Sequence, residues 1–180
     1  MIPVLVKSEH EVEVTAMEEP RWKLFAPNLI CIGMDGCKKN EYAGRIWHQY
    51  ADDPIPFRDA VDMLRIMEEL YDEWNFPQSS TKSHSFIETG STKEPKQKKG
   101  ARAKMDVNRI HNKHGNRGTF IVQVKYRQNS TWQGEVIWAE RNQKQSFRSA
   151  LELLKLIDGA LDLTEEEEEP EKQFPAGNGR

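Results

Sequence analysis

Residues 147–158 read FRSALELLKLID, and residues 57–68, ninety positions earlier, read FRDAVDMLRIME. Eleven of the twelve aligned pairs are identical or chemically similar. In both stretches apolar residues recur at intervals of three and four, which is typical of an amphipathic helix. Such helices often share apolar spacing by chance, but they do not usually share their charged positions as well. The match therefore predicts an internal duplication.

The same offset aligns the residues before each stretch without a gap. Gly44 meets Gly134, and Tyr42 meets Trp132. Apolar, β-branched runs predict strands over residues 29–34, 42–50, 119–126 and 132–139. The expected helices cover residues 57–74 and 147–161, with Ser146 as the N-cap of the second and the prolines of residues 54–56 as a break before the first. Each copy is thus expected to be a β-β-α unit.

One hairpin and one helix form too small a core to fold alone, so two copies are expected to share one. The predicted fold class is α+β: two tandem β-β-α repeats form an antiparallel sheet of about four strands with two helices on one face. The expected organisation is listed in chain order: an N-terminal segment and possible edge strand (1–27), the first repeat (28–76), a flexible basic linker (77–117), the second repeat (118–161) and a disordered acidic tail (162–180).

Charge is distributed unevenly along the 180 residues, although the net charge is only −3. Nine lysines and arginines fall within residues 93–117, and seven acids fall within residues 162–171. Hydrophobic residues make up 37% of the chain and charged residues 31%, which predicts that part of it is disordered. The two charged runs are expected either to attract each other or to serve different partners.

Two cysteines, Cys31 and Cys37, are too few for a disulfide framework. The apolar start, residues 1–6, is shorter than a signal peptide requires and is followed at once by charges. No stretch has the length of a membrane span. A soluble, cytoplasmic protein is therefore the expectation.

Side-chain alternation assigns two faces to the predicted sheet. The side chains expected under the helices are Phe120, Val122, Val124 and Tyr126, with Trp132, Val136 and Trp138 on the partner strand. The opposite, outer face is either solvated or a binding surface. Trp47 falls on this outer face, where it is either covered by the N-terminal segment or exposed for a partner. The candidate binding surface consists of five residues of that face: Arg45, Trp47, Lys125, Arg127 and Gln133.

Arg58 and Arg148 stand in the first turn of each expected helix, where the helix dipole disfavours a cation. An ion pair four residues on, with Asp62 or Glu152, is the simpler interpretation. The alternative is an anion site that combines the arginine with free backbone N–H groups at the helix start.

The sequence contains no recognisable arrangement for catalysis, for a cofactor or for a metal. His111 and His114 are three residues apart but lack an accompanying acid or cysteine, and Cys31, Cys37 and His48 lack a fourth partner. Glycine-rich phosphate loops and nucleophile elbows are also missing. We therefore expect no catalytic residues, no cofactor and no metal.

The stretches NSTWQG at residues 129–134 and FRSALEL at residues 147–153 resemble the signature of a family of small bacterial proteins with no assigned activity. The resemblance covers residues 115–161. The first copy departs from the signature, because Tyr42-Ala43 stands in place of Trp-Gln and Asp59 in place of Ser. The resemblance implies a bacterial origin and no mechanism.

The sequence is compatible with three functions. The first is a non-enzymatic interaction or regulatory protein that binds a protein partner, as a duplicated core and an acidic tail suggest. The alternative is a regulator that binds RNA or single-stranded nucleic acid through the basic linker and the outer sheet face. An enzyme is the third, without a motif to support it. Neither a membrane role nor an oligomeric state is indicated.

Overall fold

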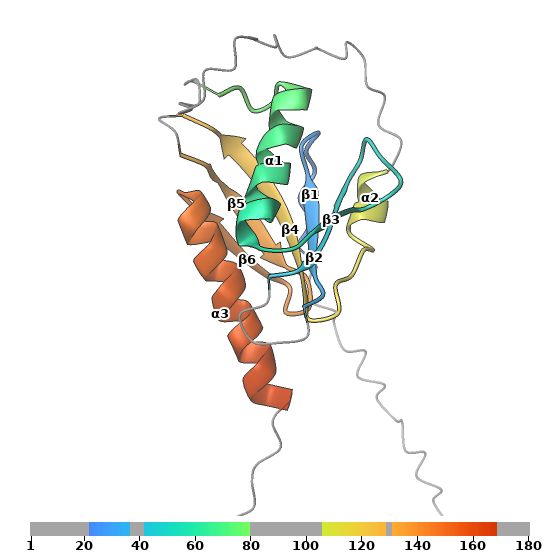
Figure 1. Cartoon of the computed structure of the whole chain (residues 1–180), viewed down its shortest axis with the longest axis vertical. Coiled ribbons are helices and arrows are strands. Elements are labelled where there is room, and N and C mark those ends of the chain that lie inside the picture. Colours follow the sequence, from blue (N-terminus) through green and yellow to red (C-terminus); the bar gives the residue numbers. More distant parts are fainter. Residues whose placement is uncertain (1–21, 37–41, 80–105, 129–130, 169–180) are drawn as a thin grey trace, which may run out of the picture.

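The computed structural model describes residues 22–36, 42–79, 106–128 and 131–168, with backbone alone for residues 165–168. Within these ranges the chain forms one six-stranded antiparallel sheet and three helices (Figure 1). The α+β class is confirmed, whereas the expected four strands and two helices are wrong. Most of the expected linker, Cys37 and the end of the acidic tail lie outside the described residues.

The order of three strands followed by a long helix occurs twice along the chain, with the short α2 between the two occurrences. The strands are β1 (Ile30–Met34), β2 (Gly44–His48), β3 (Ile55–Phe57), β4 (Gly118–Tyr126), β5 (Gln133–Trp138) and β6 (Gln143–Phe147), and the helices are α1 (Ala60–Trp74), α2 (Val107–Ile110) and α3 (Ala150–Glu168). The strand order across the sheet is β3-β2-β1-β4-β5-β6. Each half of the sheet therefore contributes three consecutive strands, followed in the chain by one long helix.

The strand registers of the two halves differ by ninety residues throughout. Met34 pairs with Gly44 in the first half, and Val124 pairs with Gly134 in the second. At the centre, β1 pairs antiparallel with β4 around the pair Cys31 and Ile121. The registers are thus related as a duplication would require, although the duplication itself stays a prediction.

The expected β-β-α unit lacked one strand in each half. Residues 54–56 were expected to break the chain, but Ile55–Phe57 forms β3, and residues before Phe147 form β6. Pro56 is tolerated because β3 is an edge strand, where its missing N–H removes no ladder hydrogen bond. The observed unit is therefore β-β-β-α.

Both long helices begin three residues later than expected, behind a side-chain cap. The carboxylate of Asp59 accepts a hydrogen bond from the backbone N–H of Asp62, at 2.7 Å. The hydroxyl of Ser149 accepts one from the N–H of Glu152, at 3.0 Å. The assignment of Ser146 as N-cap is wrong, because Ser146 lies within β6 and pairs with Glu135.

The core lies between the sheet and the two long helices, which cover the same face (Figure 1). Alternate strand residues, including Ile32, Phe120 and Val122, are fully or almost fully buried there. The expected inner face of the second hairpin is confirmed from Phe120 to Val124 and at Trp132, Val136 and Trp138. Tyr126 was expected on the same face, but it follows a register irregularity and is 55% exposed. α3 continues to Glu168 and so includes the first part of the expected tail. None of the described helices combines the length and apolarity that crossing a membrane would require.

Candidate binding surfaces

The outer face of the sheet is covered by two segments, residues 22–29 and 106–117, which we call the cover. Leu24 and Leu29 from the first segment and Ile110 from α2 are buried against the sheet. They pack with four sheet residues, Cys31, Trp47, Ile121 and Ile137. The outer face is thus a second, smaller core. Residues 106–117, which were expected to be part of the basic linker, belong to the layer that covers it.

Polar contacts fix the cover at several points. The side-chain amide of Asn28 donates to the carbonyl of Val124 at 2.6 Å. Nε2 of His111 lies 2.9 Å from the carbonyl oxygen of Leu24, which ties the two segments together. The backbone N–H of Trp22 donates to Oδ1 of Asn142 at 2.6 Å. These bonds bring the two cover segments into one layer.

Trp47 and Cys31 are enclosed by this layer. Trp47 is only 5% exposed, so of the two alternatives for this residue, coverage is the one observed. The coverage comes from α2 as well as from the N-terminal segment. Burial raises the pKa of the Cys31 thiol far above its usual range, and the nearby Glu140 adds to this. Cys31 therefore stays protonated and is a packing residue.

The cover presents two aromatic side chains to solvent. Trp22 is 51% exposed and Phe25 is 65% exposed. The ammonium of Lys144 stands 4.8 Å from the centre of the Trp22 ring, and the ring of Phe25 lies 6.1 Å from that of His111. Exposed aromatics with nearby cations are typical of recognition surfaces. The sequence patterns did not indicate that Trp22 and Phe25 are binding residues, because both precede the first strand and follow no periodicity.

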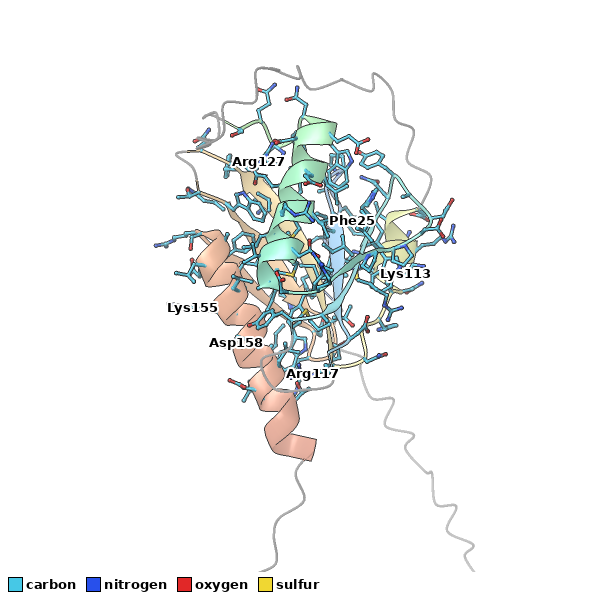
Figure 2. The ribbon with its side chains drawn as sticks, in the orientation of Figure 1. Phe25, Lys113, Arg117, Arg127, Lys155 and Asp158 are labelled. Carbon is cyan, nitrogen blue, oxygen red and sulfur yellow. The ribbon has the colours of Figure 1, made fainter. Side chains whose placement is uncertain are left out.

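The cover and the helices carry opposite charge. The cover has four bases and one acid: Lys23, Arg109, Lys113, Arg117 and Asp106. The described side chains of α1 and α3 include eight acids and two bases: Asp62, Glu68, Glu69, Asp72, Glu73, Glu152, Asp158, Asp162, Arg65 and Lys155. Figure 2 shows Phe25 and Lys113 near α2, and Lys155 and Asp158 along α3. The molecule is therefore polarised between its two faces.

Arg45, a candidate binding residue, holds the edge of the cover to the sheet. Its Nε and second terminal nitrogen donate to the two Asp35 oxygens at 2.6 and 2.9 Å. The guanidinium also lies 4.8 Å from the centre of the Trp47 ring. The Arg45 hydrogen bonds, helped by one from the N–H of Asn116, hold the pKa of Asp35 below its usual value against partial burial. Arg45 therefore has a structural role.

Lys125 lies on β4 and Gln133 on β5. Lys125 forms an ion pair with Glu135 at 2.9 Å, and Lys144 approaches the same carboxylate at 3.4 Å. Hydrogen bonding from Lys125 lowers the pKa of Glu135 despite partial burial. Gln133 is exposed. These side chains do not join Trp47 in one open surface.

The placement of Arg127 on the outer face is wrong. The register shifts between Val124 and Tyr126, and Arg127, which follows this irregularity, is only 3% exposed. Its Nε donates to the carbonyl of Pro77 at 2.7 Å. One terminal nitrogen contacts Glu68 at 3.0 Å and Asp72 at 2.6 Å, so the arginine joins the second half to the end of α1 (Figure 2).

Arg58 and Arg148 begin the two capping motifs. The backbone N–H of Arg58 donates to Asp62, and that of Arg148 donates to Glu152 at 2.7 Å. Nε of Arg58 also lies 3.6 Å from Asp62, so an ion pair is present in the first copy. The carboxylates thus occupy backbone donors that an anion site at the helix start would need.

Within the described ranges, no group of three or more histidine, cysteine or acidic residues is arranged to hold a metal ion. Comparison with protein-family models, with curated proteins and with solved structures finds no match for this chain.

Proposed function

We propose that the chain is a non-enzymatic interaction protein that binds a protein partner through the cover. The observation that carries this proposal is the pair of exposed aromatics, Trp22 and Phe25, on a layer with an excess of positive charge. Aromatic residues are enriched at the centres of protein interfaces, where they contribute much of the binding energy. A complementary partner would present an apolar pocket with an acidic rim.

The charge distribution favours a protein over a nucleic acid. A polyanion would experience the negative potential of α1 and α3 as well as the positive cover, because electrostatic forces extend beyond direct contact. Several cations near the cover are also engaged internally: Arg45 with Asp35, and Lys125 and Lys144 with Glu135. A protein partner needs a local match of charge and shape, which the cover offers.

The experiment is a comparative cross-linking and capture from bacterial lysate. The bait proteins are the wild type, the double variant Trp22→Ala/Phe25→Ala, and Leu151→Ala as a matched control. Leu151 is also an exposed large apolar residue but lies on α3. We expect a partner captured by wild type and control and lost from the double variant. A partner retained equally by all three would refute the proposed surface.

Single-stranded nucleic acid is the second candidate partner. It is favoured by one specific observation: six bases of residues 93–104 precede α2 in the chain, and Lys144 stands beside the exposed ring of Trp22. Base stacking on such aromatics is tolerant of sequence and depends strongly on salt. A gel shift with single-stranded RNA and DNA at low and high salt tests it. Binding that the double aromatic substitution does not weaken would exclude this site.

Two further proposals concern the origin and location of the protein and the duplication within its chain. The resemblance of residues 115–161 supports a bacterial origin, and a cytoplasmic location is proposed with it. The common register offset supports an origin by internal duplication. Detection of the protein in fractionated cells tests the first, and a relative with one β-β-β-α unit would support the second.

A further inference from the structure

A cavity of about 280 Å³ lies between α3 and the inner face of β5 and β6. Its apolar wall consists of Phe120, Val136, Leu156, Ala160 and Leu163. Polar side chains from Gln143, Gln145 and Lys155 also line it. A mostly apolar concavity with a few polar groups is the usual form of a small-molecule site, and this one is near the small end of the size range.

The cavity coincides with a difference between the two halves. At the offset of ninety, Trp74 of α1 corresponds to Thr164 of α3. The Trp74 ring packs against His48 and Tyr50, with ring centres 5.2 and 5.1 Å away. The Thr164 side chain is much shorter, and its hydroxyl bonds back to Ala160 and Leu161 on its own helix. The second half thus lacks the large side chain that closes the first.

A second difference widens the space. Gly159 corresponds to Glu69, and a β-carbon built on Gly159 would meet no atom within 4 Å. Glycine in a helix interior is destabilising relative to alanine. Packing does not require this glycine, so its small size leaves room at the cavity wall.

Trp138, which corresponds to His48, lines the cavity and is 7% exposed. Its indole Nε1–H is buried and finds no hydrogen-bond acceptor among the described residues. A water-sized probe does not reach Nε1, so this donor is covered by the protein itself and does not bond to a ligand in the cavity. The indole instead serves as a spectroscopic reporter in the cavity wall.

From these observations we infer that the cavity binds a small amphipathic monocarboxylate of about ten non-hydrogen atoms. The apolar body packs against Phe120, Val136 and Leu156. The carboxylate accepts hydrogen bonds from the side-chain amides of Gln143 and Gln145, and its negative charge lies toward Lys155. This site is separate from the cover, so it does not depend on the proposed protein partner.

The test is a titration of the full, ¹⁵N-labelled chain with octanoate, followed by NMR. The Trp138 indole signal is assigned by its loss in Trp138→Phe. Because Trp138 lines the cavity, we expect that signal to shift and to saturate at millimolar octanoate. Gly159→Leu, which fills the open space, is expected to weaken binding at least tenfold, whereas Gly159→Ala retains it. Absence of a shift in the wild type, or equal binding by Gly159→Leu, would overturn the inference.

The charge of the ligand is tested with matched probes. Octylamine has a similar apolar body and the opposite charge, and we expect it to bind at least tenfold more weakly than octanoate. Lys155→Gln is expected to reduce octanoate affinity and to leave octanol affinity unchanged. Equal affinity for octylamine and octanoate would contradict an anionic ligand.

Discussion

The ring of Phe147 in β6 occupies the space where a β-carbon of Gly134 in β5 would stand. The two residues are register partners, and a β-carbon on Gly134 would lie 2.8 Å from Cζ of the ring and closer still to the carbonyl oxygen of Gln123. Gly44 and Phe57 have the same relationship in the first half, at 2.7 Å. Glycine at both positions thus permits close packing of the third strand.

Gly134→Ala is therefore expected to lower the free energy of unfolding by about 2–4 kcal/mol, because the backbone oxygen of Gln123 cannot move away cheaply. Gly44→Ala should cost a similar amount. Urea denaturation measures both, with Gly159→Ala as the control, since it meets no atom and should stabilise by up to about 1 kcal/mol. A loss below 0.5 kcal/mol for Gly134→Ala, on the order of an ordinary surface change, would contradict this packing.

The caps allow a comparison between two serines. Ser149→Ala removes the acceptor for the N–H of Glu152 and should cost about 1 kcal/mol. Ser146→Ala lies in β6, outside the helix, and should change stability by less than about 0.5 kcal/mol. Chemical denaturation of the two variants decides between the observed cap and the one that the sequence suggested. A larger loss at Ser146 would reverse the assignment.

Arg127 is expected to contribute more to stability than its neighbour Lys125. Arg127→Ala breaks contacts to Glu68, Asp72 and the Pro77 carbonyl, and we expect a loss of about 2–3 kcal/mol, because the two acids are only partly buried. Arg127→Lys should recover little, since a single ammonium cannot match the fork of contacts. Lys125→Ala leaves Lys144 beside the partly buried Glu135 carboxylate and should cost below about 1 kcal/mol. Equal losses at both positions in urea would disprove the buried role.

The lowered pKa of Asp35 predicts that its contribution to the free energy of unfolding depends on pH. Its folded pKa is lowered from 3.8, chiefly by hydrogen bonds from Arg45, so its contribution is present above that value and is lost as pH falls through the lower folded pKa. Asp35→Asn should therefore be less stable than wild type near pH 6, and the difference should shrink toward pH 2. Urea midpoints across this range test the effect. A difference independent of pH would assign the loss to packing.

The sequence was sufficient for the two long helices and for most of the inner sheet face, because their apolar spacing was regular. It did not indicate α2, β3 or β6. In β3, Pro56 is a residue that strands usually exclude, so it was interpreted as a break. In β6, polar residues such as Gln143 and Gln145 lack the alternation of a half-buried strand. Edge strands have one partner and little buried surface, so their sequences are weakly constrained.

The candidate surface was harder to predict for a different reason. Trp47 was correctly assigned to the outer face, but nothing local showed that Ile110, about sixty residues further on, would cover it. Arg127 was assigned to the wrong face because a register irregularity interrupts the side-chain alternation just before it. Such long-range packing leaves no periodic signal in the chain. The cover, with Trp22 and Phe25, consequently became visible only in the fold.

The most direct test of the central claim, that the cover binds a protein, is the affinity of the captured partner for purified chain, measured by calorimetry. We expect Trp22→Ala/Phe25→Ala to weaken binding at least tenfold, on the order of the loss of one interface hot spot. Leu151→Ala should bind as the wild type does. Unchanged affinity of the double variant would contradict the claim.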